Sequence, residues 1–467
     1  MKNNYKFIRG KYVLPMNGDR EFIRDGLVVV ENDRICDIGR YDALIDRYRD
    51  MDGEWMEYED GLIMPGLVSN HTHLYQAMMK GIGSDLCLDD WVINVIYPMA
   101  LAMKKEDFYD IVRFNILEMI STGTTCFADS MYHHHNLDNI DGVAEAVRDM
   151  HMRGMIVRAV QSVNFDERIP DACAEREIEI TRAESIRCIK QYDHTENGRI
   201  RVGLEALSPF DCDERTIREL YGICEEYDVR FQMHVAEAIT EQVRIRSSHN
   251  MGVIEYLDKL GVVSDRTLLI HNIWVTPSEI QLIARRRANV AHNPVSNMIL
   301  ADGIAPIPEY LANGITVGLG VDGAASNNNQ DMFETMKACV LLHRVNRLDA
   351  SIMKAYDALE MATISSARSI GWEKEIGSLE VGKKADLIVV KTNSCHMGPQ
   401  LDVVTNLVFS GNGRDVDTVM IDGDIVMKNR EFTMFHAEEI VRRGNECALK
   451  IAEKADVFNR INNLGKN

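Results

Sequence analysis

Residues 62–73 read Leu-Ile-Met-Pro-Gly-Leu-Val-Ser-Asn-His-Thr-His, an apolar run that ends in two histidines separated by one residue. The apolar part, Leu62–Val68, has the length and composition of a buried strand. Seven similar runs follow, with longer helical patterns between them, at Thr124–Ala128, Ile156–Val160, Arg201–Ala206, Arg230–Val235, Leu268–His271, Asn289–His292 and Thr316–Val321. Eight parallel strands alternating with helices predict an α/β fold, a (β/α)8 TIM barrel whose functional residues lie where the strands end.

The two ends of the chain show a different pattern, typical of short strands with tight turns. Such runs are Lys6–Met16, Gly26–Glu31 and Arg34–Ile38 before the barrel, and Ala385–Val390, Val416–Ile421 and Ile425–Met427 after it. We predict that both ends combine into one small, discontinuous β-sandwich domain. The predicted organisation gives residues 1–60 and 374–435 to this domain, 61–373 to the barrel and 436–467 to a C-terminal helix.

The composition is that of a folded protein with a strongly acidic balance. Of the 467 residues, 46% are hydrophobic and 27% are charged, and 72 acidic against 52 basic residues give a net charge of -20. Such a charge repels nucleic acid and anionic membrane surfaces. The N-terminus has no apolar signal segment and the cysteines form no C-x-x-C pair, so we expect a cytoplasmic protein with reduced thiols.

Residues able to bind a metal ion stand at the ends of four predicted strands. His71 and His73 follow the first strand, His234 closes the fifth, His271 the sixth and Asp322 the eighth. Residues i and i+2 of a strand point to the same side, so the first two imidazoles can face one ion. One such histidine alone is usually structural, but four strands ending this way at one barrel face indicate a metal centre. Histidines combined with an aspartate suit zinc or ferrous iron.

Longer motifs around these residues resemble a known superfamily. They are Pro65-Gly-Leu-Val-Ser-Asn-His-Thr-His-Leu-Tyr-Gln, His234-Val-Ala-Glu, His292-Asn-Pro-Val-Ser-Asn-Met and Val321-Asp-Gly-Ala-Ala-Ser-Asn, with Gly377-Ser-Leu-Glu-Val-Gly-Lys-Lys-Ala-Asp-Leu-Ile and Val419-Met-Ile-Asp-Gly near the C-terminal end. The set resembles the amidohydrolase superfamily, in the branch of S-adenosylhomocysteine and methylthioadenosine deaminases, cytosine and guanine deaminases, and triazine hydrolases such as atrazine chlorohydrolase. The resemblance extends over nearly the whole chain.

The resemblance implies one divalent metal, with zinc favoured over iron. Its ligands would be His71, His73, His234 and Asp322. Dinuclear members of the superfamily bridge two metals with a carboxylated lysine on the fourth strand. The fourth strand here, Arg201-Val-Gly-Leu-Glu-Ala-Leu, contains no lysine. We therefore expect a mononuclear site.

The implied reaction removes an amino group from a nitrogen heterocycle, such as a purine, pterin or pyrimidine, and releases ammonia. A divalent cation lowers the pKa of its water from about 16 towards about 7. By the resemblance, Asp322 takes the proton of the water and later passes it to ammonia, and Glu237 protonates the ring nitrogen. His271 would hold the attacking water and stabilise the developing oxygen charge. The protein would then be a hydrolase of carbon-nitrogen bonds other than peptide bonds.

Four residues are predicted to contact the substrate. Adenosine-type members carry an acidic residue before a tryptophan after the first strand, matched here by Asp90 and Trp91, and an arginine after the third, for which Arg168 is the nearest candidate. Gln76, just past the first strand, could reach a ring heteroatom. The same members have Pro-His-Ser-Pro after the fourth strand, where this chain has Leu207 in place of the histidine, and this departure weakens the case for adenosine.

Two alternatives stay open. One is a triazine-type hydrolase that releases chloride or an alkylamine, because Met361-Ala-Thr-Ile and Asp417-Thr-Val-Met-Ile-Asp-Gly resemble atrazine chlorohydrolase as well as the deaminases. The other is a catalytically inactive metal-binding scaffold, although every hydrolytic position is filled. The expected partner is a small heterocyclic substrate, and barrels of this size often pair, which favours a homodimer.

Overall fold

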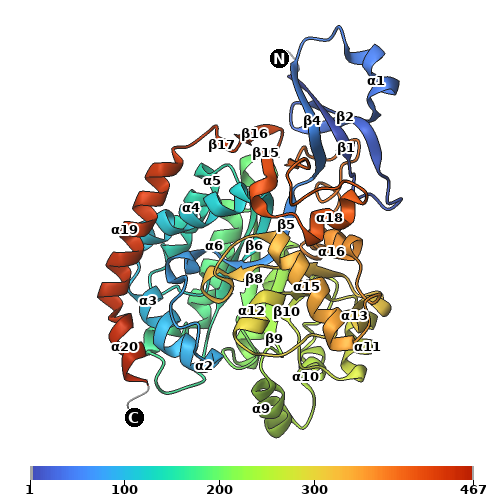
Figure 1. Cartoon of the computed structure of the whole chain (residues 1–467). Coiled ribbons are helices and arrows are strands. Elements are labelled where there is room, and N and C mark those ends of the chain that lie inside the picture. Colours follow the sequence, from blue (N-terminus) through green and yellow to red (C-terminus); the bar gives the residue numbers. More distant parts are fainter. Residues whose placement is uncertain (1–3, 465–467) are drawn as a thin grey trace.

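The computed structural model describes residues 4–464 and has a barrel as its larger part (Figure 1). The parallel strands of the barrel follow the order β12-β11-β10-β9-β8-β7-β6-β5-β13. Their bounds are β5 Leu67–His73, β6 Thr124–Asp129, β7 Arg153–Val160, β8 Ile200–Ala206, β9 Arg230–Val235, β10 Thr267–His271, β11 Asn289–His292, β12 Val317–Leu319 and β13 Asp322–Gly323. Because β12 pairs with β11 while β13 pairs with β5, the sheet closes on itself. The predicted barrel is confirmed, with its eighth strand divided into β12 and β13.

Helices surround the barrel and connect its strands (Figure 1). The principal ones are α4 Lys105–Ser121, α5 Asn139–Asp149, α6 Ile178–Tyr192, α8 Glu214–Tyr227, α9 Ile239–His249, α10 Val253–Leu260, α11 Pro277–Arg286, α13 Ile307–Ala312 and α15 Met332–Arg347. Several carry the local signals that start a helix. The side chain of Asp213 accepts a hydrogen bond from Thr216 N at the start of α8, and Thr276 caps α11 in the same way before a proline.

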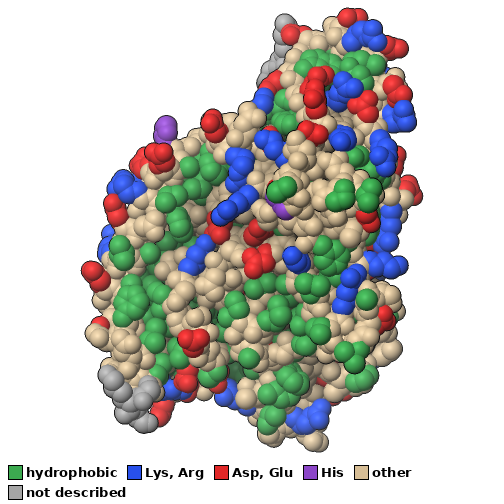
Figure 2. Space-filling model, in the orientation of Figure 1, with side chains coloured by type: hydrophobic (Ala, Val, Ile, Leu, Met, Phe, Trp, Pro, Cys, Tyr) green, Lys and Arg blue, Asp and Glu red, His purple; other side chains and the backbone are tan. Residues whose placement is uncertain are grey.

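The second sheet is built from both chain ends and is ordered β17-β16-β15-β14-β4-β1-β2-β3. Its strands are β1 Tyr5–Val13, β2 Ile23–Glu31, β3 Arg34–Arg40, β4 Glu54–Pro65, β14 Leu387–Lys391, β15 Val416–Ile421, β16 Asp424–Lys428 and β17 Glu431–Phe432. All neighbours are antiparallel except β1 and β4, which run parallel. A helix that the sequence did not suggest, α1 (Tyr41–Tyr48), covers part of it through Leu44 and Tyr48. Acidic and basic side chains are interspersed on this part of the surface (Figure 2).

The boundary between the two sheets differs from the predicted first barrel strand. Residues 62–65 end β4 of the terminal sheet, where Leu62 is opposite Val390, and the barrel strand β5 begins only at Leu67. Gly66 lies between them, so close to Thr125 that an added Cβ would meet its Oγ1 at 2.0 Å. Apolar composition could not reveal this boundary because both segments are fully buried.

The chain ends in two helices, α19 (Ala437–Ala455) and α20 (Val457–Asn463), separated by Asp456 with a φ of 52°. The longer helix packs along α4 (Figure 1), with Arg443 bonded to Asp110 at 2.9 Å and Lys450 to Asp107 at 2.7 Å. None of the described helices is long and apolar enough to cross a membrane. None of the ten cysteines forms a disulfide in the described structure.

Candidate active site

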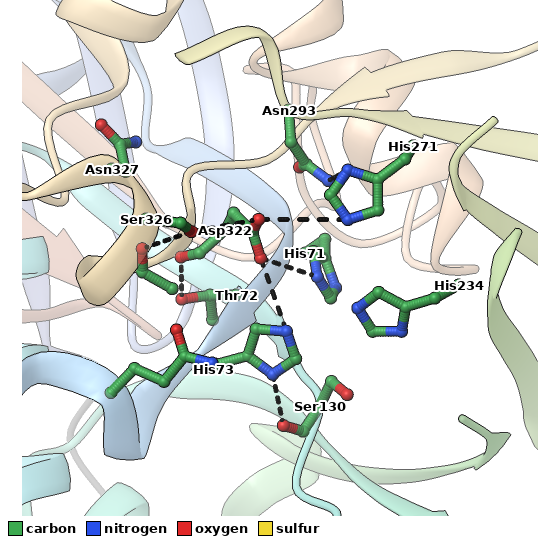
Figure 3. Close-up of polar contacts among 12 residues, drawn as sticks. His71, Thr72, His73, Ser130, His234, His271, Asn293, Asp322, Ser326 and Asn327 are labelled. Carbon is green, nitrogen blue, oxygen red and sulfur yellow. Dashed lines mark hydrogen bonds and ion pairs between the residues drawn. The ribbon is translucent and has the colours of Figure 1, made fainter. Parts of the chain in front are cut away.

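The predicted metal ligands converge at one mouth of the barrel (Figure 3). His71 and His73 come from the end of β5, His234 from β9, His271 from the end of β10 and Asp322 from the start of β13. These strands are parallel, so their carboxyl ends meet at the same face although the residues are far apart in sequence. All five residues are largely or fully buried.

The distances between these side chains are those of one compact cluster. Oδ1 of Asp322 lies 3.1 Å from Nε2 of His71 and 3.5 Å from Nε2 of His73, and its Oδ2 lies 3.9 Å from Nε2 of His271. Three ring nitrogens, one from each of His71, His73 and His234, lie within 4.8 Å of one another. One ligand atom from each of His71, His271 and Asp322 forms a second group within the same distance. The two groups share His71, so the five side chains surround one region.

Hydrogen bonds to the outer ring nitrogens aim three of the imidazoles. Nδ1 of His73 lies 2.8 Å from the carbonyl oxygen of Ser130, Nδ1 of His234 lies 2.7 Å from Oε1 of Glu205, and Nδ1 of His271 lies 2.8 Å from Oδ1 of Asn297. Each of these three partners is an acceptor, which assigns the ring proton to Nδ1; at His271 the Asn297 oxygen is nearer than a second neighbour of Nδ1, the amide nitrogen of Asn293 at 3.3 Å. The lone pair of Nε2 in each ring is therefore free to face the centre of the cluster.

The donor set fits a divalent cation. His71 is completely buried, and neither of its ring nitrogens makes a well-formed hydrogen bond with another described residue. Burial lowers the pKa of His71, His234 and His271 to about 4, so these rings are neutral near pH 7 and can donate a lone pair. Burial opposes the ionisation of Asp322, but the close approach of His71 outweighs it and holds the pKa of Asp322 well below its usual value. Neutral imidazoles beside a carboxylate are the protonation states that a metal requires.

Two members of the cluster have strained backbones. His271 has a φ of 64° and Asp322 a φ of 59°, in the left-handed region that side-chain-bearing residues rarely adopt. Such a conformation costs on the order of 1–3 kcal/mol and persists where the surroundings enforce it. At Asp322, the hydroxyl of Thr72 donates to the Asp322 carbonyl oxygen at 2.9 Å. The next residue, Gly323, packs so closely against Gln76 that an added Cβ would lie 1.7 Å from its Oε1.

Glu237 lies beside His271, with its Oε1 3.3 Å from Nε2 of the ring. Burial, together with the neighbouring carboxylates Asp302 and Asp322, raises the pKa of Glu237 well above its ordinary value. This environment therefore favours the protonated form of the side chain. A buried carboxylic acid next to a metal-competent cluster can deliver a proton to a bound molecule.

A pocket opens over the cluster. Its wall is formed by His73, Gln76, Leu88, Asp89, Trp91, Val92, Tyr97, Tyr132, Phe165, Leu207, Ser208, Phe210, Asp211, His234, Glu237, Ala238, Thr240, Glu241, Arg244, His271, Leu300, Asp322 and Ser326. Aromatic and aliphatic side chains thus combine with several carboxyl groups. An apolar pocket with a few convergent polar groups is the usual form of a small-molecule site.

The predicted substrate contacts divide into two pairs. Gln76 and Trp91 line the pocket, and each has a buried polar atom, Oε1 and Nε1 respectively, without a partner among the described residues. Asp90 and Arg168 are not in the lining, and their side chains are 43% and 51% exposed and 3.3 Å apart. Arg168 also pairs with Asp166 at 2.9 Å.

Several pocket and support residues escaped the sequence analysis. Asp89, one position before the predicted Asp90, lines the pocket, as do Asp211, Glu241 and Arg244. Asp211 lies in a loop, Asp89 and Glu241 lie at helix starts and Arg244 lies within α9, so no strand-end pattern marked them. Glu205 had a visible signal: it is a carboxylate within an apolar strand, which is rare without a specific partner.

A second cluster of possible ligands lies apart from this pocket. His292, Cys339 and His343 are all fully buried, with Nε2 of the two histidines 3.1 Å apart. Burial lowers the pKa of both imidazoles and raises that of the thiol, so all three are neutral. The cluster offers three donors, one fewer than a closed tetrahedral zinc site, and a hydrogen bond already joins the rings.

Known proteins resemble this chain over most of its length. Residues 62–426 match the amidohydrolase family. The chain is 34% identical to a 5'-deoxyadenosine deaminase of Methanobrevibacter smithii, over 92% of this chain and 94% of that protein. It is also 34% identical to a 5-methylthioadenosine/S-adenosylhomocysteine deaminase of Syntrophomonas wolfei, over 95% of this chain and 98% of that protein.

Solved structures share the fold. An adenosine deaminase from Xanthomonas campestris with bound zinc superimposes with a TM-score of 0.89 at 26% identity, over 96% of this chain and 98% of that one. A zinc complex of an atrazine chlorohydrolase from Arthrobacter aurescens gives a TM-score of 0.88 at 24% identity, over 95% of this chain and 100% of that one. At this lower identity the second likeness speaks for the fold alone.

Proposed function

This chain belongs to the amidohydrolase family, and on that basis we propose that it is a metal-dependent deaminase that removes the amino group of an adenosine-type purine as ammonia. It is a hydrolase of carbon-nitrogen bonds. The relatives that it matches at 34% identity over nearly their full length are named as deaminases of 5'-deoxyadenosine and of 5-methylthioadenosine or S-adenosylhomocysteine. The observation that carries the proposal is the buried acid Glu237 beside the metal-competent cluster at the base of one pocket.

We propose His71, His73, His234 and Asp322 as the ligands of one metal ion. Three neutral imidazoles and one carboxylate suit zinc, with ferrous iron as the alternative. The zinc in the structurally similar adenosine deaminase supports the choice of zinc. A divalent cation held there supplies the acidity that makes water a nucleophile near neutral pH.

The residues of the chain supply the proton transfers. The Asp322 carboxylate accepts the proton of the attacking water and later gives it to the departing ammonia. Glu237, in its protonated form, donates to the ring nitrogen so that the ring carbon accepts the nucleophile, and it recovers a proton from the new hydroxyl group as the product carbonyl forms. His271, whose ring proton is on Nδ1 facing Asn297, accepts a hydrogen bond from the water through Nε2 and so orients it. Stabilising a developing oxyanion, the second role expected from the sequence, would need the other tautomer of His271.

The charges of the pocket favour a substrate without a phosphate. Among the described residues that line the pocket, Arg244 is the one cation, and it is accompanied by the carboxyl groups of Asp89, Asp211 and Glu241. The Arg244 guanidinium is 3.8 Å from Asp89 and near the Phe210 ring, at 5.8 Å from the ring centre. Arg244 is already paired with Asp89, and burial raises the pKa of Asp211 to about 7 and that of Glu241 to about 8. A phosphate would therefore find no free positive charge among the described residues of this pocket, which disfavours its binding. A nucleoside therefore fits this pocket better than a nucleotide.

The leaving group separates this proposal from the triazine alternative. A panel of purine nucleosides, pterins, pyrimidines and triazines, incubated with zinc-loaded protein, should release ammonia from one or more adenosine-type compounds. Release of chloride or an alkylamine without ammonia would favour the triazine-type hydrolase instead. An inactive scaffold would bind ligands in this panel without any turnover.

The remaining expectations concern partners and assembly. The partner that the fold and the relatives support is a small heterocyclic molecule. The homodimer and the cytoplasmic location stay predictions from the sequence. Light scattering of the purified protein tests the first, and fractionation of the source cells tests the second.

A further inference from the structure

A fully buried carboxylate, Glu205, stands directly behind the proposed metal centre. Its side chain has no solvent exposure and belongs to β8, whose other buried residues are apolar. Glu205 is paired in register with Gln232 on the neighbouring strand β9, two residues before His234. A buried charge is costly unless it has specific partners, so its contacts need a reason.

Both carboxylate oxygens of Glu205 have a partner. Oε1 accepts from Nδ1 of His234 at 2.7 Å, and Oε2 accepts from the Gln232 amide nitrogen, also at 2.7 Å. The same amide nitrogen lies 3.0 Å from the carbonyl oxygen of Asp129 on β6. The carboxylate is therefore clamped from two sides, and its direction towards His234 is fixed by the barrel strands themselves.

This contact differs from those of the other imidazoles that face the cluster. The acceptor at Nδ1 of His73 is the backbone carbonyl of Ser130, and the one at Nδ1 of His271 is the amide of Asn297. Both acceptors are neutral. Among the described hydrogen bonds to these rings, His234 has the one ionisable acceptor, and carboxylate hydrogen bonds are about twice as strong as neutral ones.

We propose that Glu205 is a positioning residue for the metal ion. It acts through His234, whose Nδ1 proton it holds so that the Nε2 lone pair points into the centre, and it makes that imidazole a stronger donor. The inference rests on the proposed metal ligands and adds a residue that does not itself touch the metal.

The test is the affinity of the protein for Zn²⁺, measured by competition with a coloured chelator. Glu205→Gln keeps the shape and an acceptor oxygen but removes the charge, and Glu205→Ala removes both. We expect zinc to bind about 10-fold more weakly to the first and up to about 100-fold more weakly to the second, the usual range for outer partners of metal ligands. Asn297→Ala is the matched control, because it removes the same kind of contact from His271, which is outside the proposed ligand set. It should lower turnover and leave the zinc affinity within about twofold.

Zinc affinities of Glu205→Gln and Glu205→Ala equal to that of the unmodified protein would overturn the inference and leave the metal centre standing. Failure of the unmodified protein to bind zinc tightly would instead contradict the metal centre, and this inference with it. Circular dichroism of each metal-free variant shows whether it folds. Should both Glu205 variants misfold, Gln232→Ala frees Oε2 while keeping Glu205, and a zinc affinity unchanged in that variant would also count against the inference.

Discussion

Nε2 of His271 and Oε1 of Glu237 lie 3.3 Å apart at the base of the pocket, where the two side chains are 1% and 10% exposed. The imidazole is neutral because burial lowers its pKa to about 4, and the acid is protonated because burial raises its pKa. The Glu237 carboxyl group, which follows β9, therefore holds a transferable proton beside the His271 ring at the end of β10. In the proposed reaction, this proton goes to the ring nitrogen of the substrate.

Replacing Glu237 by Gln should abolish that transfer while preserving the pocket. We expect kcat for ammonia release to fall by about 10²–10⁴-fold, the usual contribution of general acid catalysis, with a much smaller change in the binding of a substrate analogue. Steady-state ammonia release and calorimetric binding measure the two effects. Elemental analysis is the control and should find the metal content unchanged. A variant with more than a tenth of the original kcat would rule out this role for Glu237.

Removing the metal should abolish activity reversibly. Dialysis against a chelator is expected to remove one equivalent of metal per chain, and zinc should restore ammonia release. His71→Asn should retain far less than one equivalent, because His71 lies at the centre of both ligand groups. His343→Asn, in the buried cluster away from the pocket, is the comparison and should retain the full equivalent. Two equivalents in the unmodified protein would contradict the mononuclear site.

The acidic wall of the pocket should discriminate against phosphorylated substrates. Above pH 8, where Asp211 is ionised, we expect kcat/KM for adenosine 5'-monophosphate to be at least about 100-fold below that for adenosine or 5'-deoxyadenosine, since like charges brought together cost several kcal/mol. The double variant Asp89→Asn, Asp211→Asn should narrow this ratio. Equal rates with the nucleoside and the nucleotide would show that the carboxylates do not face that end of the substrate.

Asp211 should make the stability of the protein depend on pH. Burial raises the pKa of Asp211 to about 7, from 3.8. The folded state then binds more protons than the unfolded state between these values, so stability falls as the pH rises from about 4 to about 7. Asp211→Asn removes this loss and should gain up to about 4 kcal/mol relative to the original protein at pH 8, and little at pH 4. Urea unfolding at both pH values measures it.

The control for this stability effect is Asp171→Asn, because the Asp171 side chain is 84% exposed. That variant should change the free energy of unfolding by less than about 0.5 kcal/mol at either pH. A gain in Asp211→Asn that is equal at pH 4 and pH 8 would mean that packing, and not ionisation, is responsible.

The sequence predicted the barrel and the convergence of the five clustered side chains because both follow local rules. Apolar runs with helical patterns between them marked the strands, and alternation along β5 put His71 and His73 on one side. Parallel strands carry their carboxyl ends to one face, so residues such as His234 and Asp322 could be expected together without knowing any distance. The motifs around them then matched a family whose chemistry uses that arrangement.

The tertiary structure alone decided what depends on closure of the barrel and on loop geometry. It divided residues 62–68 between two sheets. It joined Glu205 on β8 to side chains of β9 by hydrogen bonds, and it held His271 and Asp322 in left-handed conformations. It also brought Asp89 and Asp211 into the pocket wall while Asp90 and Arg168 paired outside it. A sequence pattern reports the period and polarity of a segment, whereas these features arise from contacts between segments that no local period encodes.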